Sequence, residues 1–545
     1  MPAEQAAQTP NILVLMVDQM RADALSCAGH PVIRTPALDR LAAEGTRFAN
    51  AYTPVPVCIA ARHSFMTGQR CARHGRHGNN VPNPEPQLPT VMELLGLAGY
   101  TTRGIGKMHF RPVRRHFGFH RMELMEEIPD HREDDEYLLY LKAHGYGHKR
   151  EVHGVRNLLY HLPQVSAIPE ERHGSTWVAD RTIEFLKAHR RRPFFCWSSW
   201  IAPHPPWNPP EPWASKYPFE TIPPPFNYDR PRESMTPQRR YMRDYASMGN
   251  SSPERLKRVK ALYYGSISLI DHGVGRILRA LDALGLAERT LVAFVSDHGE
   301  MLGDHGQWQK SIPYEGSTRI PFLARLPGRI EAGAVREEFV SLLDLAPTFL
   351  DLARVPYPGT PALPGASLLG RPGGGLAEPR SEIVLEIGHE AGRWLSLRRG
   401  NWKYNYYLRD GWEELYDLAA DPREAANLLL GEARPAERRR ADEMKAALEA
   451  WERKHGFADS LDAAGRLKNY NLPEPQPARA NSQFPRWVDK LPPEELAQME
   501  SKGETVLNAI RHETTFTLRD IDLESFKQAG GSLEGTEYEG LIEGQ

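Results

Sequence analysis

The chain has 545 residues, too many for one simple hydrophobic core, so two or three structural units are expected. Apolar residues make up 40% of it and charged residues 25%, the balance of a globular protein rather than of a disordered chain. A formal net charge of −2 excludes a global field that would attract nucleic acid or an anionic membrane, so we expect neither as a partner. Any selectivity for an anion must come from a local site.

The cysteines and the N-terminal segment indicate the compartment. The four cysteines are Cys27, Cys58, Cys71 and Cys196, too few for a disulfide framework in a chain of this length. Residues 1–10 are polar and lack a basic region, and the apolar run that follows, residues 12–17, is too short for a signal sequence or a membrane span. These features predict a reduced, cytoplasmic protein.

Short apolar runs alternate with amphipathic stretches along the first two thirds of the chain. This alternation favours an α/β architecture in which the strands are buried and mostly parallel. Strands are predicted at residues 12–17, 100–106, 194–200 and 291–296, and helices at 36–45 and 256–286. The proline-dense stretch 203–231 is predicted to be an ordered surface loop or lid, anchored by Trp207, Trp213, Tyr217 and Phe219.

A break in pattern at residues 356–375 is the best candidate for a domain boundary. Short strands separated by Gly and Asp turns are predicted beyond it, at residues 383–386, 394–398, 402–408 and 414–418, and a charged helix at about 434–454. The sequence therefore predicts a catalytic domain over residues 1–370, a smaller C-terminal α+β subdomain over 371–455, and an arm over 456–545.

Polar residues follow each of the four predicted strands of the first domain. They are Asp18-Gln19, Lys107 with His109, His204, and Asp297-His298. One such residue alone is usually a turn, a helix cap or a solvated charge. Because ligands gather beyond the carboxyl ends of parallel strands, the joint pattern predicts a site that holds a hard divalent cation.

Cys58 lies in a segment of unusual character. Pro54 and Pro56 keep the approach extended, and the residues that follow can open a helix with Cys58 near its N-terminus and Arg62 one turn later. A helix N-terminus and a guanidinium both favour an anion there. Taken alone, the segment is equally compatible with a thiol of lowered pKa or with a small buried residue.

The pattern Cys58-x-Ala60-x-Arg62 followed by Thr67-Gly68 resembles the signature of the sulfatase family, in which the cysteine becomes formylglycine. The common form has proline where this chain has Ala60. Further segments resemble the family over about residues 11 to 430 and in its order. They are Asp18-Gln19, Gly106-Lys107-Met108-His109, Ala202-Pro203-His204-Pro205, Asp297-His298-Gly299, Trp308-Gln309-Lys310, and Leu415-Tyr416-Asp417-Leu418 with Asp421-Pro422 and Asn427-Leu428.

The resemblance implies an alkaline-phosphatase-like fold: a central mixed, mostly parallel sheet between helices, with a smaller C-terminal antiparallel sheet. It implies one divalent metal ion, Ca²⁺ or Mn²⁺, and a maturation enzyme that converts Cys58 to formylglycine. The implied metal ligands are Asp18, Gln19, residue 58, Asp297 and His298. The implied catalytic residues are Cys58, Arg62, Lys107, His109, His204 and Lys310.

Each of these residues has an implied role. The hydrated aldehyde attacks sulfur while the metal, Lys107 and Arg62 hold the developing charge. His204 with Lys310 supplies the proton to the leaving alcohol, and the second hydroxyl then expels sulfate, with His109 assisting. Asp297 also takes the proton of the attacking hydroxyl.

Three functions are weighed. The first is a sulfatase for aryl or small organic sulfate esters, in the branch of the arylsulfatases, choline sulfatases and phosphonate monoester hydrolases. The second is a phosphonate monoester hydrolase or phosphodiesterase, and the two cationic groups expected at Lys107 and His109 favour the first. A non-catalytic binding protein on the same fold is disfavoured because the whole residue set is present.

Two surface features bear on partners. The aromatic residues of the loop over residues 203–228 can clasp an aryl group, stack on a cationic alcohol, or only fasten the loop. The arm over residues 456–545, with Tyr470, Phe484 and Trp487, is expected to reach a neighbour's site in a homo-oligomer, a dimer or tetramer.

Overall fold

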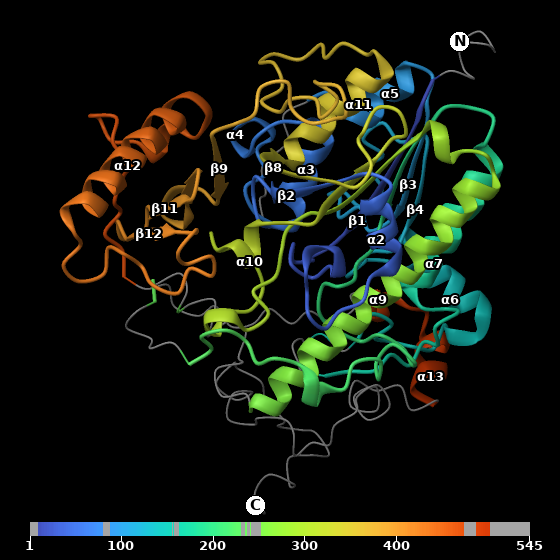
Figure 1. Ribbon diagram of the computed structural model, residues 1–545. Helices are drawn as coiled ribbons and strands as arrows, with labels where there is room; N and C mark the ends of the chain where they lie inside the picture. Colours follow the sequence, from blue (N-terminus) through green and yellow to red (C-terminus); the bar gives the residue numbers. More distant parts are fainter. Residues whose placement is uncertain are drawn as a thin grey trace, which may run out of the picture.

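A computed structural model describes residues 9–79, 88–154, 156, 163–229, 235–236, 240, 252–473 and 487–501. Two sheets organise these residues, a large one that runs through the main body and a small one at its side (Figure 1). No helix within the described ranges combines the length and the apolar character needed to cross a bilayer.

The large sheet has eight strands, most of them parallel. In sheet order they are β4 (Arg121–Leu124), β3 (Thr101–Gly106), β5 (Phe194–Ser199), β1 (Asn11–Val17), β6 (Thr290–Ser296), β7 (Phe322–Arg325), β2 (Thr46–Tyr52) and β8 (Ala334–Ser341). Neighbours from β4 to β6 are parallel, β7 is antiparallel to β6 and β2, and β8 is parallel to β2. The predicted mixed, mostly parallel α/β sheet is confirmed.

Helices cover both faces of the large sheet, which explains why β1 is apolar along its whole length. Leu13, Leu15 and Val17 point into one core, and Ile12, Val14 and Met16 into the other. The first core is closed by α2 (Pro36–Ala43), α7 (Gly174–His189) and α9 (Pro253–Ala283), and the second by α3 (Cys58–Thr67), α5 (Val91–Leu97) and α11 (Leu345–Ala353) (Figure 1). Shorter helices are α4 (Cys71–His74), α6 (Glu136–Leu141) and α10 (Glu315–Thr318).

The small antiparallel sheet packs on both of its faces. Its strands, in order, are β12 (Glu413–Asp417), β11 (Trp402–Tyr407), β10 (Trp394–Arg399) and β9 (Glu382–Ile387). One face, with Leu385 and Trp394, joins the second core of the main body, whereas Leu395 and Tyr404 pack against α12 (Pro435–His455). The predicted C-terminal sheet is confirmed, and the domain limits at residues 370 and 455 stay predictions.

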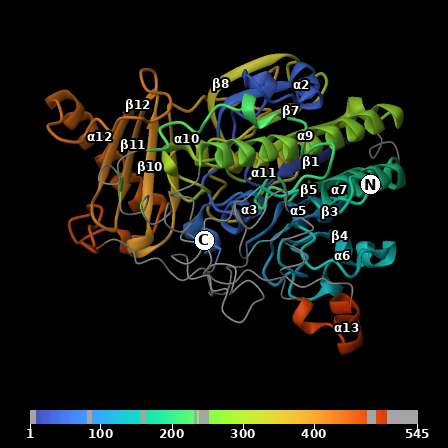
Figure 2. The ribbon, with the colours of Figure 1, turned by 90° about the horizontal axis from the view of Figure 1, so that it is seen from below.

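The described parts of the expected arm lie against the same chain. Residues 456–473 continue from α12 along the small sheet, where the Tyr470 amide donates to the Leu408 carbonyl at 2.9 Å. Helix α13 (Pro493–Ser501) lies beside α6 at the opposite end of the molecule (Figure 2). Trp487 is buried in the first core, and Glu495 pairs with Arg132 at 2.5 Å. Phe484 lies outside the described residues.

Arg393 holds the small sheet to α12 through a buried ion-pair network, and its removal should be costly. The Arg393 guanidinium reaches Glu386 at 2.7 Å and Glu452 at 2.7 and 2.8 Å, with all three side chains buried. Arg393→Ala leaves two buried carboxylates without a cation and should lower the free energy of unfolding by about 3–5 kcal/mol. Arg399→Ala, which breaks the half-exposed pair with Glu382, should cost less than about 1 kcal/mol. Urea unfolding measures both, and equal losses would contradict this account.

His74, at the end of α4, should make the fold acid-sensitive. Its Nδ1 accepts from the Arg76 amide at 3.1 Å and its Nε2 faces the Ser64 hydroxyl at 2.9 Å, so the buried ring is neutral. Burial, with His63 nearby, holds the pKa of His74 well below its ordinary value. Unfolding therefore takes up a proton below the unfolded pKa of about 6.5, and stability falls by up to about 1.4 kcal/mol per pH unit. His74→Gln should remove that part of the decline in unfolding free energy between pH 7 and pH 5, and an unchanged slope would contradict the assignment.

Candidate active site

The register of the large sheet brings the polar strand ends together. Val17 of β1 pairs with Ser296 of β6, so Asp18 and Asp297 follow at the same edge, and the Asp297 amide donates to the Val17 carbonyl at 3.2 Å. On the other side of β1, Gly106 of β3 pairs with Ser199 of β5, and the Lys107 amide donates to the Ser199 carbonyl at 2.9 Å. Four adjacent strands thus deliver their polar ends to one point.

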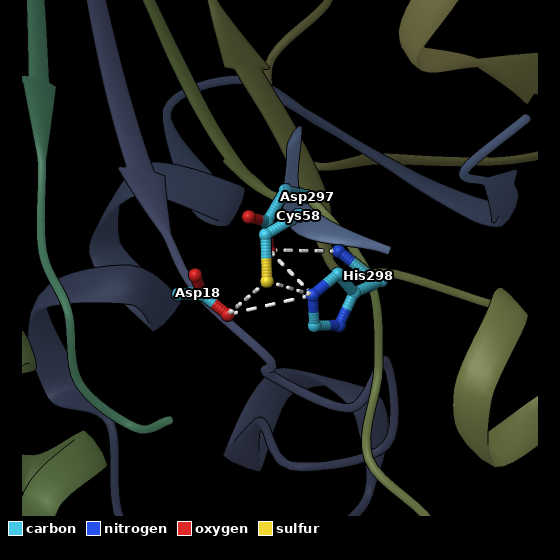
Figure 3. Close-up of side chains that lie close together, drawn as sticks. All are labelled: Asp18, Cys58, Asp297 and His298. Carbon is cyan, nitrogen blue, oxygen red and sulfur yellow. Dashed lines mark hydrogen bonds and ion pairs between the residues drawn. The ribbon is translucent and has the colours of Figure 1, made fainter. Parts of the chain in front are cut away.

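Asp18, Cys58, Asp297 and His298 form a fully buried cluster at this edge (Figure 3). One ligand atom from each lies within 4.8 Å of the others. The Cys58 Sγ is 3.1 Å from His298 Nε2 and 3.7 Å from Asp18 Oδ1.

Helix α3 begins at Cys58, as predicted. Val57 is extended, with a φ of −153°, and its carbonyl accepts the first helical hydrogen bond from Ala61 at 2.9 Å. Burial, with Asp18 adding to it, raises the pKa of the Cys58 thiol to about 12. Burial and Asp18 therefore act against the alternative of a thiol with a lowered pKa.

Arg62 is fully buried beside the cluster and contacts two of the strand ends. Its Nε donates to Asp297 at 2.9 Å, and its Nη1 donates to the Lys107 carbonyl at 2.6 Å and to the Ser199 hydroxyl at 2.9 Å. The sequence predicts that this guanidinium holds charge on the ester. These contacts tie the strand ends together, and Nη2, which lies 3.6 Å from Asp18 Oδ2, is buried without a hydrogen-bond partner in the described structure. The role toward the ester stays a prediction.

Lys107 and His109 sit on the far side of Asp18. The Lys107 ammonium contacts both Asp18 and Glu127. Burial alone would lower the pKa of Lys107, but the two carboxylates raise it above its ordinary value, so the group stays charged. Burial, together with Lys107, holds the pKa of His109 well below its ordinary value. The expected pair of cationic groups is thus one cation and one neutral imidazole.

His204 and Lys310 meet over the cluster. The Lys310 Nζ lies 3.0 Å from His204 Nε2 and 2.6 Å from the Gln19 side-chain oxygen. Gln19 is in turn held through its amide nitrogen by Glu300, whose other oxygen accepts from the Leu302 and Gln309 amides at 2.8 and 2.7 Å. Every predicted site residue therefore lies in one connected group.

Sequence reasoning missed the carboxylates that surround this group, above all Glu127 and Glu300. Glu300 follows the Asp297-His298 pair by two residues, so its proximity was available as a signal. Glu127 follows β4, whose four residues are too few to show a strand pattern. Because β4 pairs with β3 in parallel, its polar end reaches the same edge as Lys107.

The donor set fits a hard divalent cation. Asp18 and Asp297 offer oxygen, His298 offers nitrogen, and residue 58 points at the same space, whereas the side-chain oxygen of Gln19, the other predicted ligand, accepts from Lys310. Two wholly buried carboxylates need positive charge close by. Oxygen donors suit Ca²⁺, and the imidazole makes Mn²⁺ equally suitable.

The aromatic residues of the 203–228 loop are used for packing. Trp207 is buried against Trp308 and Tyr263, and its indole nitrogen donates to the Pro203 carbonyl at 2.7 Å. Trp213 packs on His272, and the Tyr217 hydroxyl lies 2.8 Å from that of Ser268. Of the three roles considered for these side chains, the structure favours fastening the loop.

Comparisons with known proteins agree with this arrangement. The model of the family described as Sulfatase matches residues 10–355, and that of the N-sulphoglucosamine sulphohydrolase C-terminal region matches residues 303–454. An arylsulfatase of Clostridium perfringens is 34% identical over 453 residues, which cover 78% of this chain and 91% of that protein. A choline-sulfatase of Rhizobium meliloti is 30% identical over 437 residues, 77% of this chain and 82% of that protein.

A solved structure shares the fold. It is a phosphonate monoester hydrolase of Agrobacterium radiobacter, with a TM-score of 0.68 and 24% identity over 82% of this chain and 96% of that one. The family model alone matches more than half of the chain, and it spans the four strand ends and the Cys58 segment described above. The chain therefore belongs to the sulfatase family.

Proposed function

We propose that this protein hydrolyses sulfate monoesters of aryl or small organic alcohols at the cluster around residue 58. One observation carries the proposal: Cys58 lies within 4.8 Å of three buried metal-type donors, in a connected group that also includes Lys107, His204 and Lys310. The names of the two relatives, an arylsulfatase and a choline-sulfatase, support this substrate class.

The proposal includes two groups that the chain acquires. Conversion of Cys58 to formylglycine by a maturation enzyme would supply a hydrated aldehyde as nucleophile, which the neutral thiol cannot replace. A Ca²⁺ or Mn²⁺ ion held by Asp18, Gln19, Asp297 and His298 would supply Lewis-acid stabilisation of the developing charge.

The protein's own residues would bind the sulfate group and transfer the protons. Lys107, charged and buried, would bind a sulfate oxygen in a site that excludes water, where its attraction is strong. Arg62 would hold the Asp297 carboxylate in place through the hydrogen bond at 2.9 Å. His204 and Lys310 would hold the proton that the leaving alcohol needs, and His109, as a neutral imidazole, would accept a proton when sulfate is released.

Phosphonate monoester hydrolysis is the second candidate, because a phosphonate monoester hydrolase shares the fold. The arylsulfatase and choline-sulfatase relatives favour sulfate esters over this second candidate. We further propose a catalytic unit over residues 1–370, and a cytoplasmic homo-oligomer in which parts of residues 456–545 contact a second copy.

Cys58→Ala should abolish turnover. The kcat of this variant should fall by at least about 10³-fold, because the nucleophile is removed. Cys196→Ala, which removes another fully buried cysteine from β5, should retain activity. Intact-mass analysis of the wild type should show the replacement of a thiol by an aldehyde at residue 58. A fully thiol protein that still hydrolyses sulfate esters would contradict the proposal.

A substrate panel separates the two candidate reactions. Converted protein loaded with Ca²⁺ or with Mn²⁺ should hydrolyse a nitrophenyl sulfate with a higher kcat/KM than a phenyl phosphonate monoester or a phosphodiester. The reason is that the arylsulfatase and the choline-sulfatase share 34% and 30% identity with this chain, whereas the phosphonate monoester hydrolase shares 24%. Preference for the phosphodiester under both metals would reverse the ranking.

A further inference from the structure

Glu127 is a buried carboxylate in contact with the cationic and imidazole groups of the site. Its side chain is 7% exposed and touches the Lys107 ammonium, Arg156 at 2.9 Å and His204 Nδ1 at 3.1 Å. His109 Nδ1 is 3.9 Å away. None of the metal-type donors of the cluster is among these contacts, so Glu127 is placed to act on the residues around the ester rather than on the ion.

The His204 ring is fixed by what surrounds its two nitrogens. Nδ1 faces two acceptors, the Glu127 carboxylate at 3.1 Å and the Pro205 carbonyl at 2.6 Å, so Nδ1 carries a proton. Nε2 faces the Lys310 ammonium at 3.0 Å. The proton available for transfer is therefore the one between His204 Nε2 and Lys310 Nζ.

We propose that Glu127 is a positioning residue for protonation of the leaving alcohol, which it serves by holding His204 with Nε2 toward the ester. This inference rests on the proposed function. When the S–O bond to the alcohol breaks, its electron pair goes to the alcohol oxygen, which takes the proton shared by His204 Nε2 and Lys310 Nζ. The imidazole keeps its Nδ1 proton against Glu127 throughout.

The surrounding charges make this role necessary. Burial lowers the pKa of His204 well below its ordinary value, and Lys310 acts in the same direction, whereas Glu127 opposes them. Without the carboxylate, Nδ1 would lose one of the two acceptors that fix the orientation of the ring. A carboxylate that accepts from Nδ1 is the arrangement by which other hydrolases orient a catalytic imidazole.

A purely structural role predicts a different result. If Glu127 only neutralises Lys107 and Arg156, its loss weakens sulfate binding and slows all esters alike. If it positions His204, the loss falls on esters whose alcohol is a poor leaving group, because only these need the proton. The dependence of rate on the leaving group therefore separates the two roles.

The test compares Glu127→Gln with wild type on an alkyl sulfate and a nitrophenyl sulfate, using converted, metal-loaded protein. We expect kcat/KM to fall by about 10²-fold or more for the alkyl ester and by less than about 10-fold for the nitrophenyl ester. Glu127→Asp, which keeps the carboxylate, should recover part of the alkyl activity. Glu126→Gln is the matched control, because Glu126 is the neighbouring buried carboxylate. Among its described contacts near the site, Glu126 accepts from the Met108 and His109 amides. This variant should not change the ratio of the alkyl to the nitrophenyl rate.

Adding Glu127→Gln to His204→Ala completes the experiment. The double variant should show the same alkyl-to-nitrophenyl ratio of rates as His204→Ala alone. Both substitutions impair the same proton transfer to the leaving alcohol, so their effects do not add. Equal falls for both esters in Glu127→Gln, or a further change of ratio in the double variant, would overturn this inference while leaving the proposed function intact. Converted wild type that hydrolyses neither ester would overturn the proposed function and this inference with it.

Discussion

The burial of two carboxylates at neighbouring strand ends is the constraint on which the site depends. Asp18 and Asp297 have no contact with solvent, and an isolated buried carboxylate is far too costly to persist. Arg62 pairs with Asp297, and Lys107 pairs with Asp18. Glu127 also pairs with Lys107, and Glu300 accepts from the Gln19 side chain. Removal of one partner leaves an uncompensated charge, so the site is built as a network rather than as a set of separate residues.

The sheet topology explains why such a network forms at this place. Strands β3, β5, β1 and β6 are adjacent and parallel, so their carboxyl ends meet at one edge whatever their separation in sequence. Antiparallel β7 lies between β6 and β2, so β2 runs in the same direction as β6 and its carboxyl end leads into the Cys58 segment. The site residues lie at the carboxyl ends of the longest run of parallel strands, from β4 to β6.

The parts of this arrangement that are visible in the sequence are those with a strong local pattern. The apolar run that became β1 and the two prolines before Cys58 predicted the strand and the helix start, because burial on both faces and restricted backbone angles leave few alternatives. Glu127 could not be found, since four-residue β4 has no readable periodicity and its contacts depend on the pairing with β3. The contacts of Arg62 were also hidden, because a motif identifies a residue but not which of its neighbours takes its hydrogen bonds. Likewise, only the packed structure shows that the Trp207 side chain is buried in the hydrophobic core.

The join between the small sheet and the Cys58 segment has a consequence for timing. Cys58 is 1% exposed, and the Glu386 amide of β9 donates at 3.0 Å to the carbonyl of Pro54, four residues before it. The ribosome makes Cys58 more than three hundred residues before the strand that closes over its approach. The oxidation proposed for this thiol would therefore have to take place before β9 pairs with the segment that precedes Cys58.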